Sequence, residues 1–407
     1  MSHPLSIGYI VPQFPGQTHI FFWRELQALE AMGHRVSIFS TRPPPPGLIA
    51  HAWSDDAIAR TVYLGQIRTL AAFRALAGLL SKGLLGDMLR EGHGFSKDVL
   101  ITLSAAWILK RHCDQNRLTH VHVHSCGRAA LVAALCKMLG GPDYSITLHG
   151  PLSDYGPGQR IKWNHARFAT IITQKLVDEA QTTLAGHLPD RIVIRPMGVD
   201  TDVLKRTSPY RPVERGEPMR LFSCGRLNVV KGHQDVMRAV RQLLDAGVDV
   251  RLDIAGEDDE GGKGYRLELE TLLKDLHLQD HVRLLGAIDA GTVQEHLLTA
   301  HAFVLASWHE PLGVAYMEAM SCGIPTIGTD AGGVRELISD GVTGLLVAPN
   351  NPGFLADTIR RLANDPELAM RLGKAGRAHV VANFRSQLGA ETLVKEITRL
   401  ARPQSTG

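Results

Sequence analysis

Short apolar runs alternate with longer segments of helical periodicity along the whole chain. The first run lies at 7–11 and is followed at 19–32 by a segment whose apolar positions recur at helical spacing. A second run at 35–40 completes a strand–helix–strand unit. Continuous apolar strands separated by helices are typical of parallel sheets that are covered on both faces. The pattern therefore predicts an α/β protein with doubly wound sheets.

The second half of the chain repeats this alternation. The apolar pattern there predicts strands at 220–223, 250–256, 282–286 and 302–307, and helices at 265–276 and 384–401. Three glycines fall within 261–264, so we expect a mobile loop between the second of these strands and the helix that follows it.

Two carboxylates surround the start of a further predicted helix at 313–322, which Gly323 closes. Glu310 precedes the helix, and Glu318 lies roughly 7–8 Å further along its axis. The first turn of a helix offers unpaired amides and a partial positive charge, which attract phosphate. Carboxylates on either side accept hydrogen bonds from hydroxyls. A diphosphate with polyols at both ends fits this arrangement, and a nucleotide sugar is such a ligand.

The residues of this stretch carry a family resemblance. Glu310 and Glu318 are separated by seven residues, and the motifs AGGVRE at 331–336 and GVTGLLV at 341–347 follow. Together they resemble the donor half of the retaining glycosyltransferases of family 4. The resemblance implies the GT-B architecture, with two Rossmann-like domains facing a central cleft and a C-terminal helix that crosses back to the first domain. The alternative interpretation is an ordinary buried strand–helix unit with two solvated glutamates.

Two cations near another predicted helix start match the family's donor loop. Arg226 follows Gly225, and Lys231 precedes Gly232. A bidentate guanidinium and an ammonium five residues apart form a natural clamp for a diphosphate, whereas in isolation they would be a surface pair.

The resemblance assigns Glu310 to the hydroxyls of the donor sugar and Glu318 to the ribose. It implies a donor site without metal or other cofactor, formed by Arg226, Lys231, Gly286, Glu310, Leu312, Gly313, Val314 and Glu318. The catalytic candidates are Glu310, His149, Lys231 and Arg226.

The loop at 12–18 follows the first strand and is predicted to face the acceptor, because ligands bind at the carboxyl ends of parallel strands. The family usually has a Gly-Gly pair in this loop, whereas this chain has Gly16 and Gln17 and more closely resembles a subgroup of exopolysaccharide transferases. Thr18 is the expected N-cap of the following helix. We therefore place Gly16, Gln17 and Thr18 on the acceptor side.

Histidines supply the other acceptor-side candidates. His149 lies in a TLHG stretch that resembles the family's histidine loop, and a histidine there can donate to a sugar hydroxyl or a diphosphate. His124 is the second candidate. It alternates with His120 and His122 along a predicted strand, so the three share one face. A metal site and a simple polar strand end are the alternatives.

Asp200 and Asp202 form a D-x-D pattern, which in another glycosyltransferase architecture would hold a divalent metal. Here the pattern lies in a segment that resembles the family's interdomain element, and we interpret Asp200 as a turn residue. The proline-rich segment 206–218 is predicted to be a linker. The domains are accordingly expected at 1–205 for the acceptor side and 219–383 for the donor side, with 384–407 as crossover helix and disordered tail.

Composition agrees with two cytoplasmic domains. The chain has 407 residues, 44% of them hydrophobic and 21% charged, which is too long for one compact core. We expect neither a signal peptide nor a membrane-spanning helix. The cysteines number five and lie scattered, which argues for a reducing compartment without disulfides. The net charge of +3 is too small to indicate nucleic acid as a partner.

Charge is unevenly distributed, however. The segment 60–117 has nine basic residues against four acidic ones, with Leu, Ala and Phe at helical spacing. A basic amphipathic face can lie on anionic lipid at the inner face of the plasma membrane, whereas the alternative is a helix pair packed on the sheet.

These observations favour a retaining transferase that moves a hexose from a UDP- or GDP-sugar to a glycan, most plausibly a lipid-linked exopolysaccharide or lipopolysaccharide intermediate. The alternatives are another GT-B enzyme, such as a nucleotide-sugar 2-epimerase or a phosphorylase, and a non-catalytic glycan-binding subunit of polysaccharide assembly.

Overall fold

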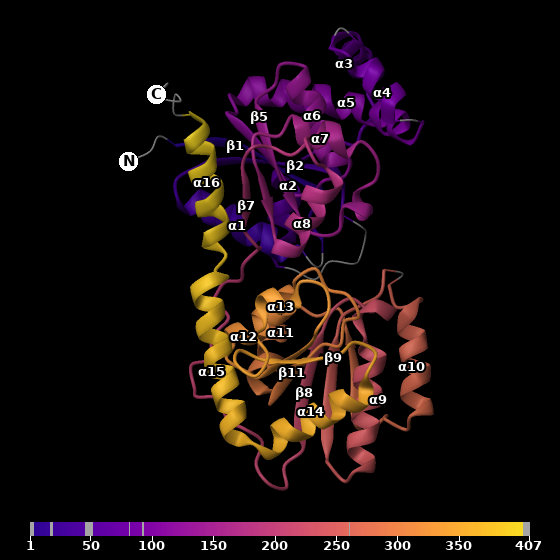
Figure 1. The fold of residues 1–407 in the computed structure, drawn as a ribbon, viewed down its shortest axis with the longest axis vertical. Coiled ribbons are helices and arrows are strands. Elements are labelled where there is room, and N and C mark those ends of the chain that lie inside the picture. Colours follow the sequence, from indigo (N-terminus) through magenta and orange to yellow (C-terminus); the bar gives the residue numbers. More distant parts are fainter. Residues whose placement is uncertain are drawn as a thin grey trace. The chain divides into compact units, whose positions relative to one another are not determined.

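The computed structural model describes residues 4–16, 19–44, 52–80, 82–91, 93–259 and 261–401. The chain divides into two compact units. The first comprises the described residues of Met1–Ile49, Trp53–Pro196 and Gln387–Gly407, and the second comprises Ala52 and the described residues of Met197–Ser386. Each unit contains one parallel sheet with helices on its faces (Figure 1). The predicted fold class is therefore confirmed.

The first unit is built on a seven-stranded sheet in the order β3-β2-β1-β4-β5-β6-β7, and every neighbouring pair is parallel. Its strands are β1 (Ser6–Gln13), β2 (Arg35–Arg42), β3 (Thr61–Tyr63), β4 (His120–Val123), β5 (Asp143–Leu148), β6 (Ala169–Ile171) and β7 (Ile192–Ile194).

The helices of this unit are α1 (Ile20–Ala31), α2 (Ser54–Arg60), α3 (Thr69–Leu80), α4 (Leu84–Glu91), α5 (His93–Asn116), α6 (Arg128–Met138), η1 (Leu152–Tyr155), α7 (Gln159–Asn164), α8 (Gln174–Thr183) and α16 (Gln387–Ala401).

The apolar run in β1 is buried over its first six residues, as expected for a strand that is covered on both faces. Its register places Tyr9 between Ile38 of β2 and His122 of β4. Phe22 and Leu26 of α1 pack on this strand in one core cluster. Sheet order therefore brings the ends of β1, β4 and β5 together at one edge.

The C-terminal helix α16 completes this core. Its residues Ala390, Leu393 and Ile397 are buried in the same cluster as α1. Arg191, just before β7, donates two hydrogen bonds to the buried Glu396 of α16, at 2.8 and 3.1 Å. Glu396 keeps its charge in this position, since the Arg191 guanidinium lowers the pKa of its carboxyl.

The second unit contains a six-stranded parallel sheet in the order β10-β9-β8-β11-β12-β13. Its strands are β8 (Met219–Cys224), β9 (Val250–Ala255), β10 (Val282–Gly286), β11 (Ala302–Val304), β12 (Thr326–Thr329) and β13 (Leu345–Val347).

The helices of this unit are η2 (Val229–Lys231), α9 (His233–Asp245), α10 (Tyr265–Asp275), α11 (Ala290–Thr299), α12 (Val314–Ser321), α13 (Val334–Leu337), α14 (Pro352–Asn364) and α15 (Pro366–Asn383). Strands β8 and β11 are neighbours, so the loops that follow them are adjacent in space.

Several boundaries differ from the sequence-based expectation. Residues 197–205 were placed in the first domain but pack in the second unit, because Ser321 and Arg377 both donate hydrogen bonds to the Leu204 carbonyl, at 2.6 and 3.2 Å. The last helix begins at Gln387 rather than at Phe384, since residues up to Ser386 belong to the second unit.

Candidate active site

Lys231 is held by the turn that joins β8 to α9. It ends the 3-10 helix η2, where the side chain of Asn228 accepts a hydrogen bond of 3.2 Å from the Lys231 amide. Gly232 then adopts a left-handed conformation with φ +69°, and a Cβ at this position would lie 1.9 Å from the Ala306 carbonyl oxygen. Only glycine permits this close approach, so the backbone fixes where the lysine side chain starts.

The loop after β11 is bound to the same turn. The Trp308 amide donates to the Val230 carbonyl at 2.8 Å, and its indole N–H donates to Asp235 of α9 at 2.7 Å. These bonds bring the loop of Glu310 onto the loop of Lys231. The structure therefore joins two segments that are distant in sequence.

Glu310 and Lys231 form an ion pair across this junction, through Oε2 and Nζ. The Ser307 hydroxyl also donates to Oε2 of Glu310 at 3.2 Å. The carboxylate is buried, with only 8% of Glu310 exposed, so it is positioned by a cation and a hydroxyl rather than by water.

A glycine loop supports the Glu310 backbone from the other side. The Gly333 amide donates to the Glu310 carbonyl at 2.9 Å. Gly332 has φ +65°, and a Cβ there would lie 2.0 Å from the same oxygen. The two glycines of the AGG motif thus pack their backbone against the carbonyl group of Glu310.

Helix α12 begins directly after Glu310. Gly313 is its N-cap and is left-handed with φ +100°. Leu312 is buried beneath this turn, and Val314 is the first helical residue. The amide end of an eight-residue helix therefore lies beside the Lys231–Glu310 pair.

Glu318 lies further along α12 and is half-buried. Its charge acts on Cys224 at the end of β8, and burial together with this carboxylate raises the pKa of the Cys224 thiol to about 12. Glu318 is therefore near enough to the end of β8 for its charge to act there.

Arg226 differs from Lys231 in its surroundings. Its side chain is 53% exposed and lies 3.7 Å from Asp259, whose side chain is 80% exposed. Such a surface pair contributes little to stability, so the guanidinium can exchange Asp259 for another anion at small cost. The aliphatic part of Lys231 lies over Gly225, the residue before Arg226. The two predicted cations are therefore neighbours.

Gly286, which was predicted to line the donor site, ends β10, and a Cβ there would lie 3.2 Å from the guanidinium of Arg266. The guanidinium of Arg266 donates to Glu257 at 2.7 Å, to Glu270 at 2.9 Å and to the Leu284 carbonyl at 3.3 Å. These bonds hold the ends of β9 and β10 in a fixed position.

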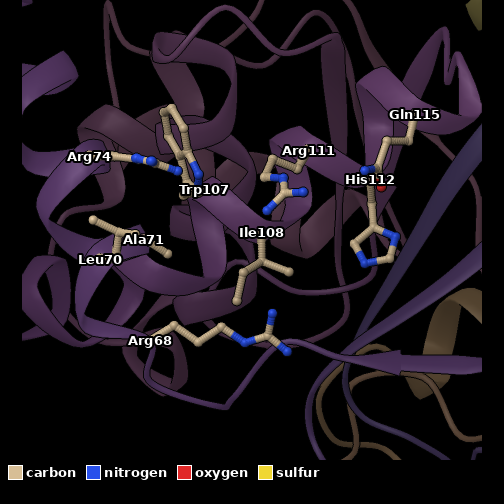
Figure 2. Close-up of a pocket in the computed structure, with 9 residues that line it drawn as sticks. All are labelled: Arg68, Leu70, Ala71, Arg74, Trp107, Ile108, Arg111, His112 and Gln115. Carbon is tan, nitrogen blue, oxygen red and sulfur yellow. The ribbon is translucent and has the colours of Figure 1, made fainter.

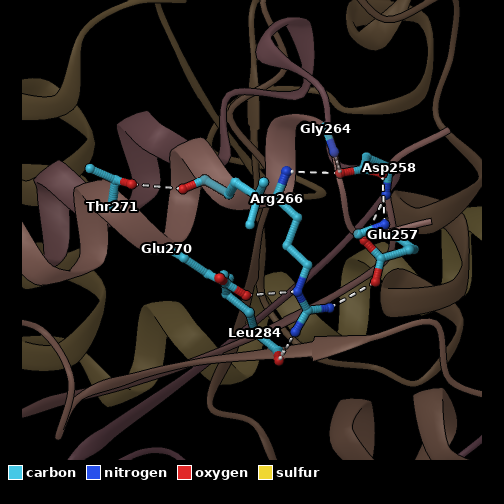
Figure 3. A network of polar contacts seen from close by, with 9 residues as sticks. Glu257, Asp258, Gly264, Arg266, Glu270, Thr271 and Leu284 are labelled. Carbon is cyan, nitrogen blue, oxygen red and sulfur yellow. Dashed lines mark hydrogen bonds and ion pairs between the residues drawn. The ribbon is translucent and has the colours of Figure 1, made fainter. Parts of the chain in front are cut away.

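The glycine-rich loop after β9, for which we expected mobility, is tied down by Asp258. Its carboxylate accepts hydrogen bonds from the amides of Gly262, Gly264 and Arg266, at 2.8 to 3.0 Å (Figure 3). One carboxylate thus binds three amides of this loop, and the mobility expected from its glycines stays a prediction.

The acceptor-side candidates lie at the matching edge of the first unit's sheet. Gly16 is buried, and its carbonyl accepts from the amide of His19, the residue before α1. Gln17 and Thr18 lie outside the described residues. His124 follows β4, His149 follows β5, and Nδ1 of His124 lies 3.2 Å from Nε2 of His149.

The other histidines of β4 are engaged in the sheet. His120 and His122 both contact the Ser145 hydroxyl, at 2.8 and 2.7 Å, and His122 also contacts Thr147 at 2.8 Å. In the described part of the chain, no three His, Cys, Asp or Glu side chains are grouped as a metal site would require. His120 and His122 therefore make polar contacts within the sheet.

Asp200 acts as a turn residue, as predicted. Its side chain accepts from the amides of Asp202 and Val203, both at 3.0 Å.

Across the residues that the structure describes, none of the helices combines the length and apolarity needed to cross a bilayer.

Sequence reasoning missed the residues that position the candidates. Asn228, Ser307, Trp308 and Asp235 carry no motif of their own, and their role follows from the adjacency of β8 and β11. The position of Asn228, three residues before Lys231 and next to a helical turn, is a capping signal that was available.

Comparison with known proteins gives two family matches. The model described as "Glycosyl transferases group 1" matches residues 206–379, and the model described as "Glycosyltransferase Family 4" matches residues 20–203. The two matches follow one another along the chain and fall on the halves that the sequence predicts to be the donor and acceptor sides.

Two relatives illustrate the range of the family. N-acetyl-alpha-D-glucosaminyl L-malate synthase of Bacillus anthracis is 29% identical over 293 residues, which cover 67% of this chain and 73% of the relative. A Salmonella typhimurium protein named as a colanic acid biosynthesis glycosyltransferase, WcaL, is 25% identical over 408 residues, covering 94% and 97% of the two chains.

Among solved structures, Anabaena HepE in complex with UDP-glucose matches with a TM-score of 0.72 at 16% identity, covering 97% of this chain and all of the other. This likeness shows the fold, which is the GT-B architecture of two Rossmann-like domains. Because both family models match in sequence and the fold agrees, we conclude that the chain belongs to glycosyltransferase family 4 and is a glycosyltransferase.

Proposed function

We propose that this protein is a retaining glycosyltransferase that transfers a hexose from a UDP- or GDP-sugar to a glycan acceptor. The observation that carries this proposal is the Lys231–Glu310 ion pair at the amide end of α12. A cation, a helix N-terminus and a buried carboxylate meet there, and a sugar diphosphate needs each of them.

The ion pair has a role in donor binding. The diphosphate of the donor takes over the Lys231 ammonium and leaves the Glu310 carboxylate to accept hydrogen bonds from the sugar hydroxyls. Arg226 gives up its exposed contact with Asp259 for the same diphosphate. Glu318, deeper along α12, accepts from the ribose.

The same groups stabilise the reaction. Cleavage of the anomeric C–O bond leaves negative charge on the diphosphate, and Arg226, Lys231 and the α12 amides are placed to stabilise it, without a requirement for metal. A double displacement would need a second carboxylate close to the first. Glu310 is instead engaged with hydroxyls, so we propose retention by front-face departure, with a phosphate oxygen receiving the acceptor's proton.

Nucleoside diphosphate binding tests the proposal. In a thermal-shift and calorimetry panel of UDP, GDP, ADP and TDP, one nucleotide at a hundredfold excess over its Kd is expected to raise the unfolding free energy by about 2–3 kcal/mol. If none of the four binds, the proposal is wrong.

Two substitutions separate the roles of the ion pair. Lys231→Ala is expected to weaken binding of that nucleotide at least tenfold, because its diphosphate loses a charge-assisted bond. Glu310→Ala is expected to keep nucleotide binding and to lose most turnover. Lys274→Ala, on the exposed face of α10, is the control. Wild-type turnover in Glu310→Ala would remove its assigned role.

The alternative reactions have their own signatures. A nucleotide-sugar 2-epimerase would convert the donor without acceptor, and a pyridoxal-phosphate phosphorylase would show a visible absorption band. A non-catalytic glycan-binding subunit would turn over no nucleotide sugar at all, even slowly. The buried Glu310 with its paired Lys231 favours the transferase over that subunit.

For the acceptor, we propose a lipid-linked exopolysaccharide or lipopolysaccharide intermediate, met at the cytoplasmic face of an anionic membrane. Helix α3 supports this proposal because much of its apolar surface is uncovered. Within the helix, Leu70, Phe73 and Leu80 are 60%, 69% and 49% exposed, and Ile67, in the loop just before it, is 72% exposed.

A pocket with three arginines lies beside this face. Arg68, Arg74 and Arg111 line it together with Trp107 and Ile108 of α5 (Figure 2). In Figure 2 Arg74 extends toward Trp107, while Arg68 and Arg111 lie on opposite sides of Ile108. Arginines next to exposed apolar side chains match the phosphates and the acyl region of an anionic bilayer.

Vesicle sedimentation tests this contact. The protein is expected to bind vesicles that contain phosphatidylglycerol and not pure phosphatidylcholine vesicles. Arg68→Glu with Arg111→Glu should reduce binding at least tenfold, since each basic residue contributes about 1 kcal/mol. Arg360→Glu, on α14 of the second unit, should leave it unchanged. Equal binding to both vesicle types would contradict the proposal.

A further inference from the structure

A line of buried and half-buried polar groups runs through the first unit at the edge where β1, β4 and β5 end. Its members are Tyr9 of β1, Glu25 of α1, His124 after β4 and His149 after β5. Motif comparison points only to the histidines. Tyr9 and Glu25 are absent from the sequence-based site, and the donor chemistry of the second unit does not use them.

The contacts in this line are short and consecutive. The Tyr9 hydroxyl donates to Oε2 of Glu25 at 2.7 Å. Nε2 of His124 lies 2.9 Å from the same oxygen, and this carboxylate is the acidic group beside it, although no hydrogen bond of good geometry to a described residue forms at Nε2. Nδ1 of His124 lies 3.2 Å from Nε2 of His149. Glu25, His124 and His149 are therefore connected end to end.

Apolar groups and backbone enclose the line. The Phe22 ring packs on both histidine rings, with centroids at 4.8 and 5.5 Å. On α16, Gly389 leaves room for the carboxylate, because a Cβ there would lie 2.2 Å from Oε1 of Glu25. Burial lowers the pKa of both His124 and His149 to about 3, so each ring carries a single proton at neutral pH.

Because each histidine ring carries one proton, each ring can donate at one nitrogen only, and this fixes the order of donors and acceptors along the line. The Glu25 carboxyl accepts from the Tyr9 hydroxyl, and its Oε2 lies 2.9 Å from Nε2 of His124, so the single proton of that ring is placed on Nε2. Nδ1 of His124 is then unprotonated and accepts from Nε2–H of His149. The proton of His149 is thereby placed on Nε2, and its Nδ1 retains a lone pair. That Nδ1 is buried and has no hydrogen-bond partner among the described residues, which is unusual for a polar atom.

We propose that Glu25 is a positioning residue, which acts through His124 to hold His149 in the tautomer with an unprotonated Nδ1, so that His149 accepts a hydrogen bond from a hydroxyl of the acceptor sugar. The inference rests on the proposed transferase function for the identity of that hydroxyl, whereas the tautomer itself is a property of the first unit alone. It also differs from the sequence-based expectation that His149 acts as a donor.

The tautomer is measurable without any substrate. Long-range ¹H–¹⁵N spectra of the full-length ¹⁵N-labelled protein at pH 7.5 distinguish protonated from unprotonated ring nitrogens. The His149 signals are assigned by their loss in His149→Asn. We expect one tautomer in the wild type, with a proton on Nε2 and none on Nδ1. A proton on Nδ1 of His149 would overturn the proposal.

Substitutions test the role of Glu25. Glu25→Met removes the acceptor for His124, and we expect His149 to lose its single tautomer and to give averaged ring shifts. Glu25→Gln keeps an oxygen that accepts from Tyr9 and His124, and should restore the wild-type pattern. Glu30→Gln, which changes another acid of α1 that pairs with Arg60, is the matched control and should change nothing. Unchanged His149 signals in Glu25→Met would refute the role of Glu25.

A kinetic measurement separates this inference from the proposed function. With an acceptor extract from the producing cell, we expect Glu25→Met to raise the acceptor KM and to lower kcat, so that kcat/KM falls at least tenfold. Glu25→Gln should recover most of the lost kcat/KM. UDP or GDP binding should stay at the wild-type level in both variants. If the wild-type protein bound neither UDP nor GDP, the transferase proposal would be contradicted, but the tautomer result would still hold.

Discussion

At the scale of single residues, the donor-side geometry depends on two places where a side chain is excluded. Gly232 lies against the Ala306 carbonyl and Gly332 against the Glu310 carbonyl. Through these contacts the backbone itself positions Lys231 and Glu310. Because an added methyl group would meet backbone rather than a flexible side chain, neighbouring loops would have to move to admit it.

Alanine substitutions of two glycines measure this effect. Gly247 has φ +77° with no atom near its missing Cβ, whereas Gly232 has φ +69° with a carbonyl oxygen 1.9 Å from that position. Gly247→Ala is expected to lower the free energy of unfolding by about 1–2 kcal/mol, the cost of the left-handed conformation. Gly232→Ala should cost about 1–3 kcal/mol more. Equal losses in urea denaturation would show that the contact at Gly232 is unimportant.

The sequence was sufficient to select Lys231, Glu310 and Glu318 as candidates, because Lys231 and Glu310 lie at recognisable helix starts and Glu318 lies within the helix that follows Glu310. It did not predict that Lys231 and Glu310 form an ion pair, since they are 79 residues apart. Their meeting depends on β8 and β11 being neighbours in the sheet. Partners such as the half-buried Glu25 were missed for the same reason, because the neighbours of Glu25 come from three other elements.

At the scale of elements, β4 is unusual because it carries buried histidines into a sheet. Hydroxyls of the adjacent β5 provide their partners, with Ser145 between His120 and His122. A neutral imidazole satisfies these contacts, but a charged one would be desolvated at high cost. Burial accordingly lowers the pKa of His120 to about 3, against the ordinary value of 6.5.

This shift predicts how stability depends on pH. Between pH 6.5 and 3 the unfolded chain binds a proton at His120 that the folded chain does not bind, so the unfolding free energy falls as the pH is lowered. His120→Asn should reduce that slope, by at most about 1.4 kcal/mol per pH unit. Urea denaturation between pH 7.5 and 5 measures it. His277→Asn, at an exposed site, is the control, and an unchanged slope in His120→Asn would contradict the assignment.

At the scale of the whole molecule, the last two helices serve different units. Helix α15 packs in the second unit through residues such as Leu372, and α16 packs in the first through Leu393. The alternation of strands and helices was readable from sequence, as was the family. Which unit the final helix completes was given by resemblance alone, because an amphipathic helix shows that it has a buried face but not what covers that face.

Matched truncations of these leucines test the division. Leu372 and Leu393 are 1% and 2% exposed, so each change to alanine is expected to cost about 2–5 kcal/mol. Hydrogen exchange should accelerate in peptides of β8 to β13 for Leu372→Ala, and in peptides of β1 to β7 for Leu393→Ala. Acceleration in the same unit for both variants would contradict the division.

The path of α16 also bears on how the protein is made. Translation completes residues up to Pro196 first, yet the hydrophobic cluster of that part lacks Ala390, Leu393 and Ile397 until the whole second unit has been synthesised. The core of the unit that begins first is thus completed by residues that are made after the other unit. A premature stop codon just after Ser386 would therefore damage the amino-terminal half, although its own codons are intact.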